Sequence, residues 1–343
     1  MYKNLFLLCV SLLAMLGLCE GVLRYFTVFP ITSSSNKVFD ERLLYRTSPK
    51  AEGVDVSGFR NAKSAGPYEL VALGDSHTFG YNVKARSGWP ALVGHKLGMH
   101  VSNMSAGGYS LLQYAALMED AVALKPKLIV VGLFAYNDFL LSCDVLALPY
   151  WQQKAAELQL AVKGCEGAGH AEPPPSRRFV EQFAVTSAVD YLWHAKRDKS
   201  VTRWLEPDST KPQLPTLSRD EKLENGRRIF AYMQHMAQAQ GIRLVVLLIP
   251  SRTLVENPKA PGGQEAERIA EETQLRNGIM AAFGEMGIEY VDALPLTQAK
   301  YQAATRENTA FYGGSHPFEA GYAAYAKSLL LYLEKAPAGP ETH

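Results

Sequence analysis

The chain has 343 residues, with 35 Lys and Arg, 34 Asp and Glu, and a formal net charge of +1. A nucleic-acid binder usually carries a basic surplus, so this balance argues against one. Apolar residues make up 47% of the chain and its 27 glycines show no periodic spacing, which excludes disordered and collagen-like proteins.

An apolar segment begins the chain. Lys3 is followed by the uncharged run LFLLCVSLLAMLGL at residues 5–18. A run of this length suits the hydrophobic region of a signal peptide, and a helix continuing to Phe26 would be long enough to anchor the chain in a membrane. We expect an uncleaved signal anchor within residues 1–26, tethered through residues 5–26. A cleaved signal peptide and a buried core helix are the alternatives. Lys3 before the span predicts an exported chain on the periplasmic or extracytoplasmic face.

Residues 27–67 contain few apolar runs and are predicted to be a connector between membrane and domain. From Tyr68 onward, short apolar runs alternate with longer amphipathic stretches. The short runs predict buried strands at Leu70–Leu73, Val101–Met104, Leu128–Leu133, Leu244–Ile249 and Ile288–Val291. The longer stretches predict helices at Gly88–Leu97, Gln113–Leu124, Arg219–Ala239, Glu265–Met286 and Phe318–Leu333. This alternation indicates an α/β domain over residues 68–335, with a parallel sheet covered by helices on both faces.

Residues 139–218 interrupt this alternation of strands and helices. They contain no convincing strand, but include helical stretches at Trp151–Val162 and Phe179–His194. A structureless loop of this length is improbable in a compact domain, so we predict a helical insertion. It is either a lid or acceptor-binding cap, or a surface elaboration without a role in substrate choice. Cys143 and Cys165 lie in the exported part, where a disulfide and two unpaired thiols are both possible. The tail, residues 336–343, is predicted to be disordered.

The first predicted strand ends in Gly74-Asp75-Ser76, where a serine on a tight turn would present its hydroxyl at the sheet edge. By itself the tripeptide also suits a capped turn without catalysis. Three later segments strengthen the catalytic interpretation. They supply a bare glycine N–H at Gly108 after the second strand, a side-chain amide at Asn137 after the third, and an imidazole at His316 before the last helix.

Together the four segments resemble the SGNH (GDSL-type) hydrolase superfamily, named for its Ser, Gly, Asn and His. The resemblance covers residues 68–333 apart from the insertion. It implies a flavodoxin-like three-layer α/β/α fold with a five-stranded parallel sheet. It also implies that Ser76 is the nucleophile, that His316 is the general base, and that Ser76, Gly108 and Asn137 donate hydrogen bonds to the oxyanion.

The sequence departs from the family pattern at Gly313, because family members usually carry an aspartate three residues before the histidine. Three interpretations remain open. In the first, His316 forms a dyad with Ser76 while bonding a backbone carbonyl; in the second, an acid comes from elsewhere; in the third, catalysis is lost. The candidate acids are Asp292, Glu307 and Glu319. Next to the nucleophile, His77 is predicted to lie at the rim or contact substrate, and Arg252 is either a contact for a substrate anion or an ordinary surface residue.

The resemblance and the predicted location lead to a serine esterase acting on O-acyl, chiefly O-acetyl, esters of cell-envelope carbohydrate. The alternatives are an O-acetyltransferase of envelope polysaccharide that uses the same nucleophile, and a non-catalytic glycan-binding or assembly protein on this fold. The glycine spacing matches neither a phosphate-binding loop nor a dinucleotide fingerprint, and no metal-ligand cluster is present, so no cofactor or metal is implied. The expected partners are an acylated carbohydrate and the membrane, with no nucleic acid. The oligomeric state stays open.

Overall fold

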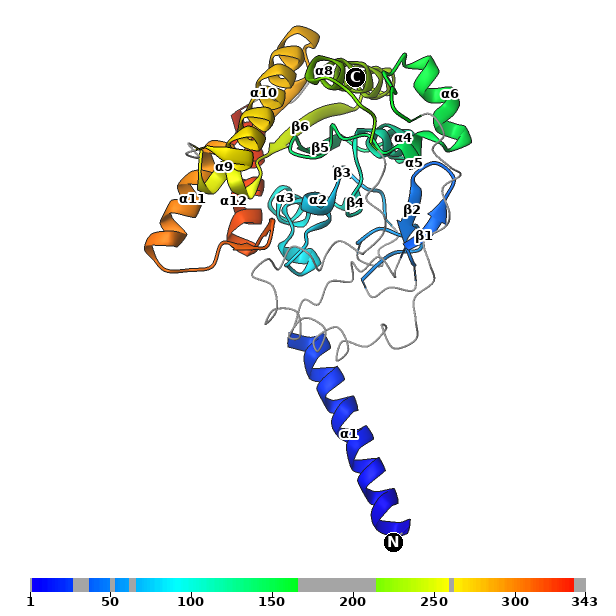
Figure 1. Cartoon of the computed structure of the whole chain (residues 1–343), viewed down its shortest axis with the longest axis vertical. Coiled ribbons are helices and arrows are strands. Elements are labelled where there is room, and N and C mark those ends of the chain that lie inside the picture. The colour runs from blue at the N-terminus through cyan, green and yellow to red at the C-terminus, as the bar shows by residue number, and fades with distance from the viewer. Residues whose placement is uncertain are drawn as a thin grey trace.

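A computed structural model describes residues 2–26, 37–49, 53–61, 66–165, 214–258 and 262–335. Its centre is a sheet of five strands in the order β4-β3-β5-β6-β7, and all four neighbouring pairs are parallel (Figure 1). The strand bounds are β3 Leu70–Gly74, β4 Val101–Ser105, β5 Leu128–Phe134, β6 Arg243–Ile249 and β7 Glu289–Asp292. The predicted flavodoxin-like parallel sheet is confirmed.

Helices cover both faces of the sheet and create two apolar cores. Alternate residues of β5 serve the two sides, with Val131 in one core and Val130 in the other. The first core receives side chains from α4 (Leu111–Ala123), α8 (Arg219–Ala239) and α10 (Gly263–Met286). The second receives them from α3 (Trp89–Leu97) and α12 (Glu319–Lys335).

Shorter elements surround this framework, mostly near the carboxyl edge of the sheet. One helix of moderate length, α11 (Leu294–Arg306), was not foreseen from the sequence because it buries only Thr297 and Ala304. The remaining elements of the domain are α2 Ser76–Phe79, the 3-10 turn η2 Ala85–Ser87, α9 Arg252–Glu256, α11 Leu294–Arg306, β8 Tyr312–Gly313 and β9 His316–Pro317.

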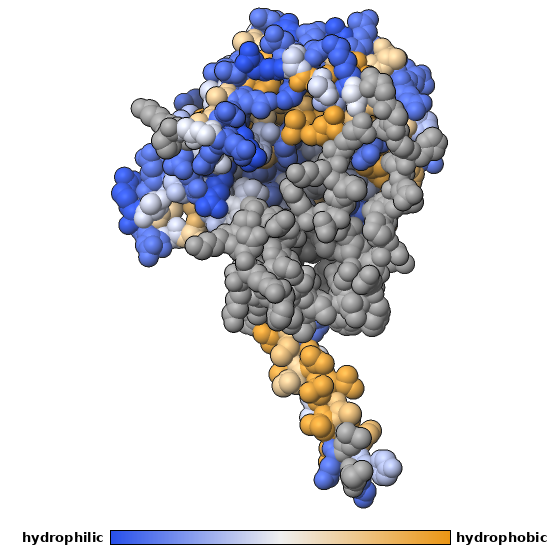
Figure 2. All heavy atoms as spheres, in the orientation of Figure 1, coloured by the Kyte–Doolittle hydropathy of each residue, from blue (hydrophilic) through white to orange (hydrophobic). Residues whose placement is uncertain are grey.

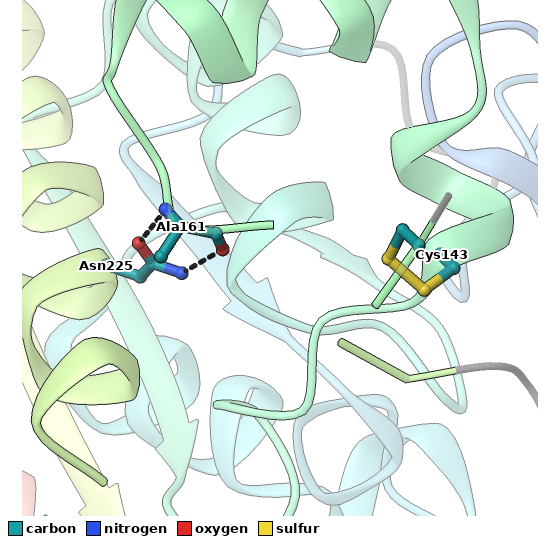
Figure 3. Close-up of a disulfide and its surroundings, with 4 residues drawn as sticks. Cys143, Ala161 and Asn225 are labelled. Carbon is teal, nitrogen blue, oxygen red and sulfur yellow. Dashed lines mark hydrogen bonds between the residues drawn. A yellow bond between two sulfur atoms is a disulfide. The ribbon is translucent and has the colours of Figure 1, made fainter. Parts of the chain in front are cut away.

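The described part of the insertion begins with α5 (Cys143–Leu146) and α6 (Pro149–Glu157). A disulfide joins Cys143 to Cys165, which decides between the two possibilities left open by the sequence (Figure 3). The Asn225 side chain of α8 exchanges two hydrogen bonds with the backbone of Ala161, at 2.8 and 2.9 Å (Figure 3). These contacts fasten the start of the insertion to the domain. The helix predicted at 179–194 lies outside the described residues, as does the tail 336–343.

At the N-terminus, α1 (Tyr2–Phe26) is one continuous helix. Its stretch Tyr2–Val22 is long and apolar enough to cross a membrane, and none of its described side chains is buried. Figure 2 shows the apolar surface of this helix, which lies away from the rest of the chain in Figure 1. The helix is compatible with either a signal sequence or a membrane anchor.

The segment predicted to be a connector contains an antiparallel hairpin, β1 (Lys37–Asp40) and β2 (Leu44–Thr47). Leu43, between the two strands, is 0% exposed and belongs to the same core as α4. Arg42 also pairs with Glu119 and Asp120 of α4, at 3.2 and 2.6 Å. The hairpin is therefore packed onto the domain. Much of the rest of the connector, residues 27–36, 50–52 and 62–65, lies outside the described residues.

Candidate active site

Ser76 lies at the carboxyl edge of the sheet, two residues beyond the end of β3. The turn before it depends on Gly74, because a Cβ there would lie 2.0 Å from Thr78 Oγ1. Asp75 caps the short helix α2 by accepting a hydrogen bond from the His77 backbone N–H at 2.8 Å. This turn places the Ser76 hydroxyl at the edge of the sheet in a mostly buried position, with 8% of the residue exposed.

His316 comes from the other end of the chain and meets Ser76. The two-residue strands β8 and β9 form a small antiparallel pair in which His316 is opposite Gly313. His316 Nε2 lies 2.7 Å from Ser76 Oγ. If the serine hydroxyl donates to Nε2, the neutral ring carries its proton on Nδ1. This arrangement can activate a serine nucleophile by taking its proton.

Gly108 and Asn137 follow the two strands that flank β3. Gly74 is in register with Ser105 of β4 and with Gly132 of β5, so the loops after all three strands begin at the same level. Gly108 is exposed and has a φ of +83°, a conformation that favours glycine. The structure thus brings Ser76, Gly108 and Asn137 to one edge of the sheet.

Each of these two loops has its own anchor. Asp138, fully buried beside Asn137, accepts hydrogen bonds from the Phe134 N–H at 2.7 Å and from the Tyr114 hydroxyl at 2.9 Å. Tyr45 of the N-terminal hairpin donates to the Gly107 carbonyl at 2.7 Å. Since the Gly107 carbonyl and the Gly108 N–H belong to one planar peptide unit, this bond fixes the direction of that N–H.

A family model matches residues 72–324, which contain Ser76, Gly108, Asn137 and His316; it is described as the GDSL-like Lipase/Acylhydrolase family. The chain belongs to this family. It is therefore an ester-bond hydrolase by family. No curated protein matches the chain.

Three solved structures that resemble this chain have sequence identities between 12% and 15%. An alpha/beta hydrolase enzyme from the metagenome of Lake Arreo, Spain, is 15% identical with a TM-score of 0.43, covering 78% of this chain and 95% of that one. The acetyl xylan esterase AlAXEase is 12% identical with a TM-score of 0.42, covering 77% and 99%. A catalytic mutant of an acetylxylan esterase from Geobacillus stearothermophilus is 14% identical with a TM-score of 0.40, covering 79% and 95%.

The site of this GDSL-family hydrolase has no aspartate at position 313, and the candidate replacement acids bond elsewhere. Asp292 accepts hydrogen bonds from the Arg276 guanidinium and from the Leu294 N–H. Glu319 accepts from Ser87 Oγ at 3.0 Å, and Glu307 is exposed. His316 Nδ1 instead lies 3.1 Å from Ser315 Oγ. A side-chain hydroxyl thus lies where one of the three interpretations had placed a backbone carbonyl.

The structure also places His77 and Arg252, the two other residues considered in the sequence. The His77 side chain is 0% exposed, so its predicted location at the rim is wrong. Its ring packs 4.1 Å from that of Phe134 and 4.6 Å from that of His316, centroid to centroid. Arg252 donates to the Gly314 carbonyl at 3.0 Å and pairs with Glu256 at 2.9 Å. This arginine therefore contacts the turn that carries His316.

Burial sets the protonation states of the site. It lowers the pKa of His316 to about 4, so the imidazole is neutral and able to accept a proton near neutral pH. Burial, and secondly the charge of His316, lower the pKa of His77 as well. Burial raises the pKa of Asp75 to about 7 and that of Asp138 well above its usual value, with the Asp75 charge adding to the latter.

Within the described parts of the chain, no group of three or more His, Cys, Asp and Glu side chains is arranged to hold a metal ion. The tyrosines around the glycine pair are among the residues that sequence reasoning missed. A Cβ at Gly107 would lie 1.8 Å from Tyr81 Oη, and one at Gly108 would lie 2.7 Å from Tyr45 Oη. Tyr81 also packs its ring 4.8 Å from that of His316. No local pattern marked Tyr45, which is 62 residues from its hydrogen-bond partner.

Proposed function

We propose that this hydrolase is an SGNH-type serine esterase that removes O-acetyl groups from cell-envelope carbohydrate. The observation that carries the proposal is the 2.7 Å contact between Ser76 Oγ and His316 Nε2 at the carboxyl edge of a parallel sheet. A serine hydroxyl paired with a neutral imidazole is the arrangement that acyl-enzyme chemistry requires.

In the first step, Ser76 Oγ attacks the ester carbonyl carbon while its proton passes to His316 Nε2. The carbonyl oxygen becomes an oxyanion, which accepts hydrogen bonds from the Ser76 N–H, the Gly108 N–H and the Asn137 side-chain amide. Collapse of this intermediate breaks the bond to the sugar oxygen, which takes the proton from His316. Water then repeats the sequence on the acetyl-serine, releasing acetate and restoring the hydroxyl.

Two observations support the substrate class. The Tyr81 hydroxyl closes against Gly107 and its ring packs 4.8 Å from that of His316, which leaves little space on that side of the site and favours a short acyl group. The apolar helix α1 is long enough to span a membrane. An anchored chain with Lys3 inside would hold its domain on the periplasmic face, within reach of cell-envelope glycans.

The test uses the full-length chain in detergent, with 4-nitrophenyl acetate and 4-nitrophenyl octanoate as substrates. We expect the acetate ester to be hydrolysed with the higher kcat/KM, and Ser76→Ala to abolish hydrolysis of both. Acetate release from an acetylated polysaccharide such as acetylxylan then tests the carbohydrate. An inactive but folded parent on all three substrates contradicts the esterase proposal, and equal activity in parent and Ser76→Ala contradicts the mechanism.

A second candidate, an O-acetyltransferase, is favoured by the enclosure of the dyad. Ser76 is 8% and His316 is 7% exposed, so an acyl-enzyme here would be partly protected from water. In that case a sugar hydroxyl replaces water in the second step. The same assay run with an unacetylated oligosaccharide separates the two activities, because a transferase yields acetylated oligosaccharide at the expense of free acetate.

A further inference from the structure

The turn that carries His316 is tied to the nucleophile segment by one side chain. Asn82, six residues after Ser76, donates from Nδ2 to the Gly313 carbonyl at 2.6 Å and to the His316 carbonyl at 3.0 Å. Its backbone has a φ of +67°, which asparagine tolerates better than most residues. The bonds span 231 and 234 residues of sequence, so Asn82 joins the two catalytic segments directly.

The Phe318 ring and this tether together leave little space for a side chain at position 313. A Cβ on Gly313 would lie 2.7 Å from Phe318 Cζ and 3.1 Å from Asn82 Nδ2. Both distances are shorter than ordinary carbon contacts, so a side chain at 313 would displace the Phe318 ring and crowd the tether. Gly313 therefore leaves room for the Asn82 side chain that holds the backbone of the His316 turn.

The ring of His316 still needs a partner at Nδ1. When Ser76 donates to Nε2, Nδ1 carries the proton, and Ser315 Oγ lies 3.1 Å from it as an acceptor. After Nε2 takes the serine proton, the ring is a cation and Nδ1–H still donates to the same oxygen. The hydroxyl can therefore select the productive tautomer and support the imidazolium, although without the full charge of a carboxylate.

Resting on the esterase proposal above, we propose that Ser315 and Asn82 are positioning residues that together replace the family's aspartate. Ser315 sets the tautomer and orientation of the His316 ring, and Asn82 holds the backbone from which the ring projects. Neither side chain is assigned a contact with the substrate, so both act through His316.

The first experiment compares Ser315→Ala and Ser315→Thr in the full-length chain with 4-nitrophenyl acetate. A hydrogen bond to a charged group contributes about 1.5–3 kcal/mol, so we expect Ser315→Ala to lower kcat about 10- to 100-fold with little change in KM. Ser315→Thr, which keeps a hydroxyl, should recover most of kcat. The matched control is Ser87→Ala, whose hydroxyl bonds Glu319 and not a catalytic residue. We expect it to keep the parent's kcat.

A second measurement reads the tautomer without using activity. In chain labelled with ¹⁵N at histidine, the ring shifts of His316 should report Nδ1–H in the parent and a loss of that preference in Ser315→Ala. Asn82→Gly tests the tether, because it removes the side-chain donor while glycine adopts the same left-handed backbone without strain. Asn308→Gly is the control, since Asn308 is also a left-handed asparagine but is exposed. We expect only Asn82→Gly to lower kcat by a comparable factor.

The outcomes separate this inference from the esterase proposal. A folded but inactive parent overturns the esterase proposal, and hydrolysis that survives in Ser76→Ala overturns the serine mechanism on which this inference rests. If Ser76→Ala is inactive but Ser315→Ala and Asn82→Gly keep the parent's kcat, the positioning proposal alone is overturned. It is equally overturned if Ser315→Ala loses kcat while the His316 tautomer is unchanged, or if Ser315→Thr is no better than Ser315→Ala.

Discussion

The two halves of the candidate site are held in place by different means. Ser76, Gly108 and Asn137 follow three adjacent strands, and the register of a buried parallel sheet brings them to one edge. His316 projects from a two-residue strand, and side chains from distant segments hold its turn. The sheet half is positioned mainly by the core, and hydrogen bonds of Asp138 and Tyr45 fix two of its loops. The loop half depends chiefly on individual hydrogen bonds that a single substitution can remove.

The largest expected effect joins the two halves. Ser76→Ala and His316→Ala should each lower kcat for an acetate ester by about 10⁴-fold or more, because nucleophile and base act as one unit. For the same reason the double variant should be no slower than either single variant. Steady-state kinetics on the three proteins tests this, and multiplicative losses would show that the residues act independently.

Next in size is a loss confined to the sheet half. Asn137→Ala removes one proposed oxyanion donor and should lower kcat about 10²- to 10³-fold. The control is Asn225→Ala, because the Asn225 side chain bonds the Ala161 backbone and not a candidate site residue. We expect the control to lower the free energy of unfolding while kcat is retained. A kcat for Asn137→Ala within twofold of the parent would contradict its role.

The pH dependence tests the loop half. Burial lowers the pKa of His316 from 6.5 to about 4, and the base must be neutral to accept the serine proton. We therefore expect kcat/KM to stay high as the pH falls through 6.5 and to decline only near pH 4. Because burial raises the pKa of Asp75 to about 7, the profile is also measured on Asp75→Asn. An acid limb at 6.5 in both proteins would contradict a buried base.

A smaller effect is expected at the N-terminal hairpin. Tyr45→Phe removes the bond to the Gly107 carbonyl and frees the Gly108 peptide to rotate, so we expect kcat to fall about 5- to 10-fold with KM nearly unchanged. Tyr150→Phe is the control, because its hydroxyl donates to Glu119 at the same 2.7 Å. Equal kcat values for the two variants would show that the hairpin does not support the candidate site.

The smallest effect is expected at Arg252, whose bond to the Gly314 carbonyl supports the turn from its outer side. Arg252→Ala should lower kcat about 3-fold, since Asn82 still holds the neighbouring carbonyls. Arg243→Ala is the control at the opposite end of β6, where Arg243 pairs with Glu289 at 2.5 Å. Turnover that falls more in the control than in Arg252→Ala would contradict this placement.

The division between the sheet half and the loop half of the site also explains which features could be predicted from the sequence. The five strands were found within one residue at either end. The strands β3, β5 and β6 are short, almost wholly buried apolar runs, and a candidate site residue follows the end of β3, β4 and β5. The β1–β2 hairpin was missed because strands such as KVFD are short and half exposed, without a buried face. Asn82 was missed because its partners lie more than 200 residues away. Ser315 was within reach of sequence reasoning, as a hydroxyl beside the histidine where the usual carboxylate is absent.

The central claim is that Ser76 and His316 form a working nucleophile and base without an aspartate at position 313. Labelling of the full-length chain with a fluorophosphonate, followed by peptide mass spectrometry, tests it most directly. We predict a covalent adduct on Ser76 that is absent in Ser76→Ala and forms far more slowly in His316→Ala. An adduct on another residue, or labelling of Ser76 at the same rate in His316→Ala, would contradict the account.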